Sequence, residues 1–317
     1  MIPGLEDGEA RTATSATLFV TLDRNSDLLT AGERSAARVL LQSPELVAGV
    51  PATIVAEIPG LNAFHFEYFD GSSFLVERDG SAVRGWWDDR SSLEDAATYL
   101  LGPIIAFVLR LRGLITVHSS AVAINGHAAM FVGRAGIGKS TTAAAFALAG
   151  YPVLTDDVAA VVPSESGMRV LPSYPRVRLW DDAVTGLLGS AEALPLLTPT
   201  WDKRYLPLNS AHGEFAEDPL PIAAMYLLRD REAEMSAPRI EPLSRLAAFP
   251  EVLGHLLTNR AIPGEPPEID FRFSSMLVER VPTFSLTANA DPARLPDLCR
   301  LVARHVADLV NATSVKT

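Results

Sequence analysis

The stretch FVGRAGIGKSTTAAAFALAGYPVLTDDVAAV, residues 131–161, decides the fold of this chain of 317 residues. Within it, residues 133–140 match the pattern G-x-x-x-x-G-K-[ST], between an apolar run and an alanine-rich helical segment. Glycines let backbone N–H groups turn inward around phosphate oxygens, and the following helix directs its free N–H groups at the same charge. The residues expected to hold nucleotide phosphates are Gly133, Gly136, Ile137, Gly138, Lys139, Ser140 and Thr141.

Lysine is scarce in this chain, which makes the match specific. Three of the 27 basic residues are lysines, namely Lys139, Lys203 and Lys316. We expect Lys139 to neutralise the β- and γ-phosphates of a nucleotide, and the Ser140 hydroxyl to bind Mg²⁺, a hard cation that prefers oxygen ligands. A glycine-rich turn that contains a lysine by chance is the weaker explanation, because the flanking strand and helix also fit the motif.

An Asn-Gly pair fixes the register of the strand before the loop. Residues 114–133 form two apolar runs joined by Asn125 and Gly126, and a type I′ turn needs positive φ at both positions. The predicted register pairs Ile124 with His127, Ala123 with Ala128, Ala121 with Met130 and Ser119 with Val132. One step further, His118 comes to lie opposite Gly133, which favours a functional histidine over a buried structural one.

Two carboxylates, Asp156 and Asp157, follow the apolar strand at residues 151–155. In a right-handed β-α-β unit this strand is parallel to the loop strand, so its carboxyl end opens on the phosphate side. One carboxylate there suits the Walker-B position that holds Mg²⁺, and the other suits proton transfer from an attacking hydroxyl. Successive strand residues point in opposite directions, so the two need not do the same job. A solvated Asp-Asp turn is the structural alternative.

The segments HSSAV, GRAGIGKST and TDDV, in this order and at short spacing, resemble the HPr kinase/phosphorylase family over about residues 113–180. The resemblance implies a P-loop kinase that uses ATP and Mg²⁺. It implies that Asp156 is the general base toward a serine hydroxyl of a protein substrate, with His118 beside it, and that Ser140 and Asp157 bind the metal. The family's Glu-x-Arg-Gly segment has no counterpart in PSYPRVRLWDD, so neither its second metal contact nor its reverse phosphorolysis reaction is expected. The chain also does not match the family's usual N-terminal domain or HPr-docking helices, so phosphorylation of HPr itself is not expected.

The segments PRVRLWDD and WDKRYLPLN are similar to diverged HPr-kinase-like proteins, which include kinases that phosphorylate a C-terminal serine of lasso-peptide precursors. The basic pair Lys203 and Arg204 is typical of the cations that stabilise the equatorial oxygens during phosphoryl transfer. A surface ion pair is the alternative for these two residues. Arg176 and Arg178 share one face of a predicted strand and are weaker candidates.

Three functions are open on this evidence. The first is an ATP- and Mg²⁺-dependent serine kinase acting on a peptide or small protein, with a ribosomal precursor peptide of the lasso type as the expected substrate. The second is a kinase of the same core whose acceptor is a small metabolite. The third is a nucleotide-sensing protein without phosphoryl transfer, which would leave His118 unused. The three motifs together favour the first.

Composition bears on partners and location. The formal net charge is −11 and the arginines are spread out, whereas nucleic-acid binding needs clustered basic residues. The apolar run at residues 99–109 is too short to span a bilayer, and the acidic N-terminus lacks a signal pattern. We therefore expect a cytoplasmic protein that binds neither nucleic acid nor membrane. The single cysteine, Cys299, is expected to be a core or helix-face residue, and the family resemblance leaves a homo-oligomer open.

The expected fold is α/β, with a P-loop, HPr-kinase-like core and mixed sheet in residues 96–317 after a small α+β domain in residues 1–95. In the first domain the sequence predicts strands at 16–23 and 63–69, a hairpin at 72–87, and a helix at 91–113 with a Ser91/Glu94 capping box, a kink at Pro103 and a C-cap at Gly113. Beyond the loop it predicts a hairpin at 159–172, a loop-rich segment at 181–221, a buried strand at 222–230, and helices at 242–262 and 292–310.

Overall fold

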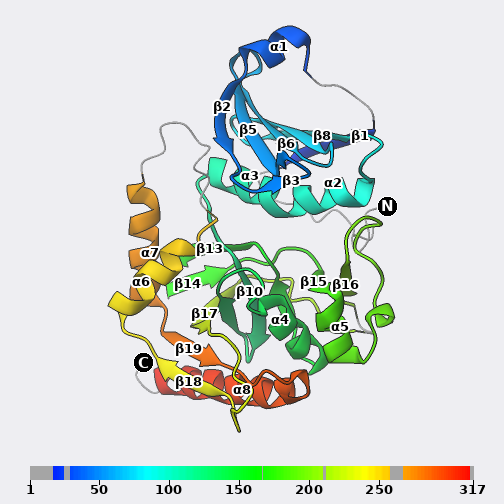
Figure 1. Ribbon diagram of the computed structural model, residues 1–317. Coiled ribbons are helices and arrows are strands. Elements are labelled where there is room, and N and C mark those ends of the chain that lie inside the picture. The colour runs from blue at the N-terminus through cyan, green and yellow to red at the C-terminus, as the bar shows by residue number, and fades with distance from the viewer. Residues whose placement is uncertain (1–16, 25–28, 166, 210–211, 258–266, 315–317) are drawn as a thin grey trace. The chain divides into compact units, whose positions relative to one another are not determined.

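The computed structural model describes residues 17–24, 29–165, 167–209, 212–257 and 267–314 of the chain. These residues form a mixed α/β fold that divides into two units (Figure 1). The first unit contains the described residues up to 114 and the short segment Thr198–Trp201, and the second contains the rest. Among the described residues, no helix combines the length and the apolar character needed to cross a membrane.

The first unit is built on a six-stranded sheet. Its elements are β1 (Phe19–Arg24), α1 (Ala31–Ala36), β2 (Arg38–Gln42), β3 (Leu46–Val47), β4 (Val50–Pro51), β5 (Thr53–Ile58), β6 (Ala63–Tyr68), β7 (Ser73–Glu77), β8 (Ala82–Trp87), α2 (Leu93–Tyr99), a π-helical turn (Leu100–Ile104) and α3 (Ile105–Leu111). The strand order is β1-β8-β7-β6-β5-β2, and only β1 and β8 are parallel neighbours in this order. The two predicted strands and the predicted hairpin are confirmed.

The helical segment that follows this sheet belongs to the first unit. Its capping box is formed by Ser92 and Asp95, one residue beyond the predicted pair, because the Ser92 side chain accepts from the Asp95 N–H. The predicted kink is the π-helical turn, where Gly102 has non-helical dihedral angles next to Pro103. The apolar face of α2 and α3 is buried with the aromatic side chains of β6 and β7. The unit therefore ends at residue 114, not at the predicted residue 95, which lies inside α2.

A short distant segment completes the first unit. The Thr200 hydroxyl donates a hydrogen bond to Asp95 Oδ1 (2.6 Å), and the Trp201 ring meets the Tyr99 ring edge-on, with 5.6 Å between ring centroids. Tyr99 in turn stacks on Tyr68 at 3.8 Å. No local pattern in the sequence indicates that Thr198–Trp201 belongs to the first unit, although the residues around it belong to the second.

The second unit is a nine-stranded mixed sheet with helices on both faces. Its elements are β9 (Ile115–Val117), β10 (Ser119–Ile124), β11 (His127–Val132), α4 (Lys139–Leu148), β12 (Val153–Thr155), β13 (Ala159–Ser164), β14 (Gly167–Val170), β15 (Arg176–Trp180), α5 (Asp181–Leu188), β16 (Lys203–Pro207), β17 (Leu220–Leu228), β18 (Arg239–Pro242), α6 (Arg245–Gly254), α7 (Glu268–Arg280), β19 (Thr283–Thr287) and α8 (Leu295–Ser314). The main path of the sheet is β12-β10-β11-β17-β14-β13-β9, with β19 on β17 and β18 on β19, and β15 and β16 form a separate ribbon.

The central strand β11 explains why the loop strand is apolar throughout. Phe131 and Ala129 face a core shared with α4 and α8, whereas Met130 and Ala128 face a core shared with α6 and α7. A strand covered on both faces has no solvent side, so its sequence shows a continuous apolar run in place of alternation. Cys299 of α8 is buried in the first of these cores, as predicted.

The predicted hairpin and its register are confirmed as far as Ser119. Asn125 and Gly126 have φ of 50° and 74°, and β10 pairs with β11 from Ile124–His127 back to Ser119–Val132. Strand β12 is antiparallel to β10, which is itself antiparallel to β11. Strands β11 and β12 therefore run in the same direction with β10 between them, and their carboxyl ends lie at the same edge of the sheet.

Elsewhere in this unit the predictions hold in part. The hairpin of β13 and β14, the buried strand β17 and the long helix α8 are present. Helix α6 ends at Gly254, and residues 258–262 of the predicted helix lie outside the described residues. The segment expected to be loop-rich contains α5 and β16, and α7, which no prediction covered, packs beside α6 and β14 (Figure 1).

Candidate functional site

The glycine loop, defined here as residues 133–138, joins β11 to α4. Gly138 is the N-cap of α4 and has a φ of 105°, a conformation that favours glycine. The Lys139 ammonium donates hydrogen bonds to the main-chain oxygens of Gly133 (2.8 Å) and Arg134 (3.1 Å), so it closes the loop from inside. Burial lowers the pKa of Lys139. An anion bound at the loop would restore the charge balance of this buried lysine.

The residues predicted to hold phosphates lie together at this loop. Gly133, Gly136, Ile137 and Gly138 belong to the loop itself, and Lys139, Ser140 and Thr141 form the first turn of α4. The first N–H groups of a helix have no partner inside the helix and attract negative charge. The loop thus combines free N–H groups with a buried ammonium.

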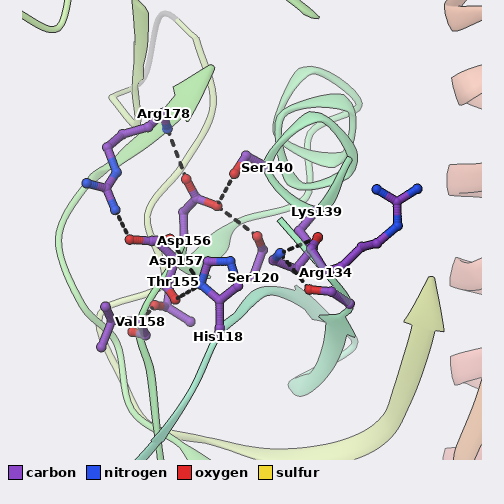
Figure 2. A network of polar contacts seen from close by, with 11 residues as sticks. His118, Ser120, Arg134, Lys139, Ser140, Thr155, Asp156, Asp157, Val158 and Arg178 are labelled. Carbon is purple, nitrogen blue, oxygen red and sulfur yellow. Dashed lines mark hydrogen bonds and ion pairs between the residues drawn. The ribbon is translucent and has the colours of Figure 1, made fainter. Parts of the chain in front are cut away.

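Asp156 follows β12 and is held against the start of α4. Its Oδ1 accepts hydrogen bonds from the hydroxyls of Ser140 (2.8 Å) and Ser120 (2.7 Å), and its Oδ2 accepts one from the Arg178 main-chain N–H (3.0 Å; Figure 2). The residue is 1% exposed. The three hydrogen bonds fix the orientation of this buried carboxylate, and the contact with Ser140 places Asp156 beside the loop.

Asp157 occupies a strained turn that directs its carboxylate away from the two serines that contact Asp156. Its φ is 76°, and the Val158 N–H donates to the Asp156 main-chain oxygen across it (3.0 Å), a pattern typical of a γ-turn. The Thr155 hydroxyl donates to the Val158 oxygen (2.7 Å) and fixes the turn from the other side. A non-glycine residue with such a φ costs about 1–3 kcal/mol and occurs preferentially at functional sites. The turn separates the environments of two consecutive carboxylates.

The Asp157 carboxylate is surrounded by positive charge. One of its oxygens forms an ion pair with the Arg178 guanidinium, and the other lies 3.2 Å from His118 Nδ1 (Figure 2). Burial acts to raise the pKa of Asp157, but Arg178, His118 and Lys203 outweigh it and hold the pKa well below its usual range. Asp157 is therefore ionised at neutral pH.

His118 reaches the site by a different route from the predicted one. It lies in the bend between β9 and β10, and its N–H donates to the His255 main-chain oxygen (2.8 Å), so the predicted pairing with Gly133 is not formed. Its Nδ1 is 3.2 Å from both the side-chain and the main-chain oxygen of Asp157. Because both oxygens are acceptors, Nδ1 carries the proton.

The two predicted cations of β16 point in opposite directions. Lys203 Nζ lies 4.4 Å from the centre of the Trp180 ring, and its charge acts on Asp157. Burial and the charge of Arg178 lower the pKa of Lys203. The Arg204 side chain instead pairs with Asp181 Oδ1 (2.9 Å) at the start of α5. Neighbours in a strand face opposite sides, so the structure does not bring the Arg204 side chain to the aspartates, and Arg204 forms an ion pair instead.

Sequence reasoning underestimated Arg178 and missed His255. Arg178 contacts both aspartates, the first through its main chain and the second through a guanidinium that is 9% exposed. Burial, with the charges of Lys139 and His118 adding to it, lowers the pKa of His255. Alternation along β15 was the available signal for Arg178, but it did not separate Arg178 from the buried Arg176.

Comparisons with known proteins add a distant structural likeness. No protein family matches the chain, and no curated protein matches it in sequence. Among solved structures, the HPr(Ser) kinase/phosphatase from Coxiella burnetii is similar over 61% of this chain and 97% of its own, with 13% identity and a TM-score of 0.35. The likeness is too distant to assign roles, so the function is inferred below from the side chains of the site.

Proposed function

We propose that the chain is a kinase that transfers a phosphoryl group from ATP, with Mg²⁺, to a serine hydroxyl of a peptide or small protein. One observation supports this most. Beside a loop that matches a nucleotide-binding motif, two consecutive carboxylates lie in different environments, Asp156 against Ser140 and Asp157 against His118 and Arg178. A protein that only binds nucleotide needs the first carboxylate and has no use for the second.

The nucleotide phosphates would be held by the glycine loop and Lys139. The N–H groups at the start of α4 and the buried ammonium are the charge complement of a polyphosphate. The two carbonyl contacts of Lys139 would give way to phosphate oxygens, since a charged acceptor makes the stronger hydrogen bond.

Ser140 and Asp156 fit a magnesium ion. A hydroxyl and a carboxylate oxygen 2.8 Å apart are hard oxygen donors at the edge of the loop. Among the described residues, no group of three or more His, Cys, Asp or Glu side chains could hold a metal. Mg²⁺ usually takes one or two protein ligands and completes its shell with water and substrate phosphates. When bound, the ion supplies positive charge to the phosphate oxygens.

Asp157 would accept the proton of the attacking hydroxyl. In the proposed step the serine oxygen forms a bond to the γ-phosphorus, the bond from that phosphorus to the β,γ-bridging oxygen breaks, ADP leaves with the electron pair, and the hydroxyl proton passes to the Asp157 carboxylate. The low pKa of Asp157 is compatible with this role, because phosphoryl transfer through a loose transition state makes little demand on base strength. His118 would orient the carboxylate through its protonated Nδ1.

This assignment exchanges the roles that the family resemblance implies for the two aspartates. Asp156 contacts the loop serine and is fixed there by three hydrogen bonds, which favours the metal-binding role. Asp157 lies beside the histidine and the arginine, which favours the acceptor side.

The acceptor is proposed to be a peptide because of Trp180. This residue ends β15, is 52% exposed and lies under Lys203, whose charge reaches Asp157. A large exposed aromatic ring is typical of a surface that binds a polypeptide. A small metabolite would have no need for it.

The test uses radiolabelled ATP and Mg²⁺ with two synthetic peptide libraries that are identical except that serine is replaced by alanine in the second. We expect label on the serine library alone, and none with the Lys139→Ala variant, which should no longer bind ATP. Label on small alcohols in place of peptides would redirect the proposal to a metabolite kinase. ATP binding with slow hydrolysis and no labelled acceptor would identify a nucleotide sensor and refute the kinase.

A further inference from the structure

The segment that follows β17 carries four consecutive charged residues, and three of them are paired. Arg229 forms a two-armed ion pair with Glu251, with distances of 2.5 and 2.9 Å. Asp230 pairs with Arg134 of the glycine loop, and Glu232 lies 3.7 Å from Arg239. The fourth residue, Arg231, stands apart from this pattern.

Arg231 lies against the glycine loop. A methyl group at Gly138 would come within 2.9 Å of Arg231 Nη2, so the absence of a side chain there lets the guanidinium approach the N-cap of α4. The side chain is half-buried, and within the part of the chain that the structure describes it has neither a hydrogen bond nor an ion pair. Burial lowers the pKa of Arg231. A partly desolvated cation without a partner is unfavourable, which suggests that an anionic ligand completes its environment.

The sheet topology indicates which part of the ligand Arg231 would meet. Strand β11, which leads into the glycine loop, has β17 on one side and β10 followed by β12 on the other. Arg231 follows β17. The carboxylates Asp156 and Asp157 follow β12, so the loop has the acidic pair on one flank and Arg231 on the other. The phosphoryl group that reacts must lie on the acidic flank, because its acceptor is deprotonated there.

We propose that Arg231 is a positioning residue that binds the diphosphate part of the nucleotide, the part that is not transferred. The inference rests on the proposed nucleotide site at the glycine loop and adds a residue and a division of labour to it. It predicts that Arg231 contributes equally to ADP and ATP binding and hardly at all to the transfer step.

The test is calorimetric titration of ADP and of ATP, each with Mg²⁺, into the full chain and three variants. Arg231→Ala should weaken both nucleotides by the same factor, roughly 10- to 100-fold, because a charged hydrogen-bond donor to phosphate is lost. Arg231→Lys should give an intermediate loss, since it keeps the charge without the two-pronged geometry. Arg300→Ala removes the same charge from an exposed position of α8 and should bind both nucleotides as the wild type does.

Thermal unfolding without nucleotide separates binding from a structural role. Because Arg231 has no hydrogen-bond or ion-pair partner among the described residues, Arg231→Ala should leave the Tm unchanged or raise it, whereas a structural arginine would lower it. Unchanged affinity in Arg231→Ala, or a loss confined to ATP, would overturn the inference and leave the kinase proposal standing. A wild-type chain that binds neither nucleotide would refute both. The kinase proposal alone would be refuted if the wild type binds both nucleotides and Arg231→Ala binds them more weakly, but the wild type transfers no phosphoryl group.

Discussion

Replacing Arg178 with methionine should destabilise the second unit strongly, because it leaves the Asp157 carboxylate without its main counter-charge. The Arg178 side chain is 9% exposed and that of Asp157 is 31% exposed, so water can compensate only in part. Removing one partner of a buried ion pair costs about 3–5 kcal/mol. His118 and Lys203 remain near the carboxylate. We therefore expect a loss of about 2–3 kcal/mol, below that range.

The pH dependence follows from the sign of the pKa shift. In the wild type the folded-state pKa of Asp157 is depressed, so the stability it contributes is present above its ordinary pKa of about 3.9 and is lost as the pH falls through the folded value. In Arg178→Met, burial is opposed by fewer charges, so the pKa of Asp157 rises. The stability difference between the two proteins should be full at pH 7, begin to shrink where Asp157 takes up a proton in folded Arg178→Met, and disappear only as the pH falls through the lower folded-state pKa of the wild type.

Calorimetric scans of the wild type, Arg178→Met and a matched control would measure the effect. A unit of this size loses about 2–4 °C of Tm per kcal/mol, so its transition should shift by roughly 5–10 °C. Arg204→Met is the control, since Arg204 sits on the neighbouring strand and pairs with Asp181, which is 40% exposed. Such a pair contributes about 0–1 kcal/mol. Equal shifts in both variants, or a difference that does not depend on pH, would refute the reasoning.

Three further predictions concern other positions. The Cys299 thiol, whose pKa burial raises to about 12, should resist Ellman's reagent at neutral pH until the chain is unfolded, and rapid labelling of the folded protein would contradict its core position. Gly126→Ala has open space around it but a φ of 74°, so denaturation should show a loss of about 1–2 kcal/mol from backbone strain, and no loss would argue against the type I′ turn. Ser120→Ala should lower the free energy of unfolding by about 1–2 kcal/mol, because it removes a donor from Asp156, but it should keep Mg²⁺-dependent ATP affinity. Ser140→Ala should lose that affinity. Equal ATP binding by the two variants would count against a Mg²⁺ ion held by Ser140 and Asp156.

The fold around the site could be predicted from the sequence because its signals are local. Asn125 and Gly126 define the turn, the turn sets the register of β10 on β11, and the glycine motif sets the start of α4. The direction of β12 followed from the handedness of β-α-β connections. Each step uses residues that are close in sequence, where backbone geometry leaves few choices.

The division of roles within the site could not be predicted because it depends on distant contacts. The two aspartates are adjacent in sequence, and their difference arises from the positive φ of Asp157 and from Arg178, which belongs to a separate ribbon. The predicted pair Lys203 and Arg204 was split because the segment became a strand, not a loop. In the first unit, α2 and α3 joined the sheet through aromatic packing, which moved the boundary to residue 114.

The most direct test of the central claim compares Asp156→Asn with Asp157→Asn in two measurements, the Mg²⁺ dependence of ATP affinity and the rate of phosphoryl transfer to a serine peptide identified from the library. Asp157→Asn should keep Mg²⁺-dependent ATP binding and lose about 10²–10⁴ in transfer rate, the range typical of a general base. Asp156→Asn should lose the Mg²⁺ dependence of binding. If Asp157→Asn transfers at the wild-type rate, or if Asp156→Asn still binds ATP in a Mg²⁺-dependent way, the division of roles between the two carboxylates is wrong.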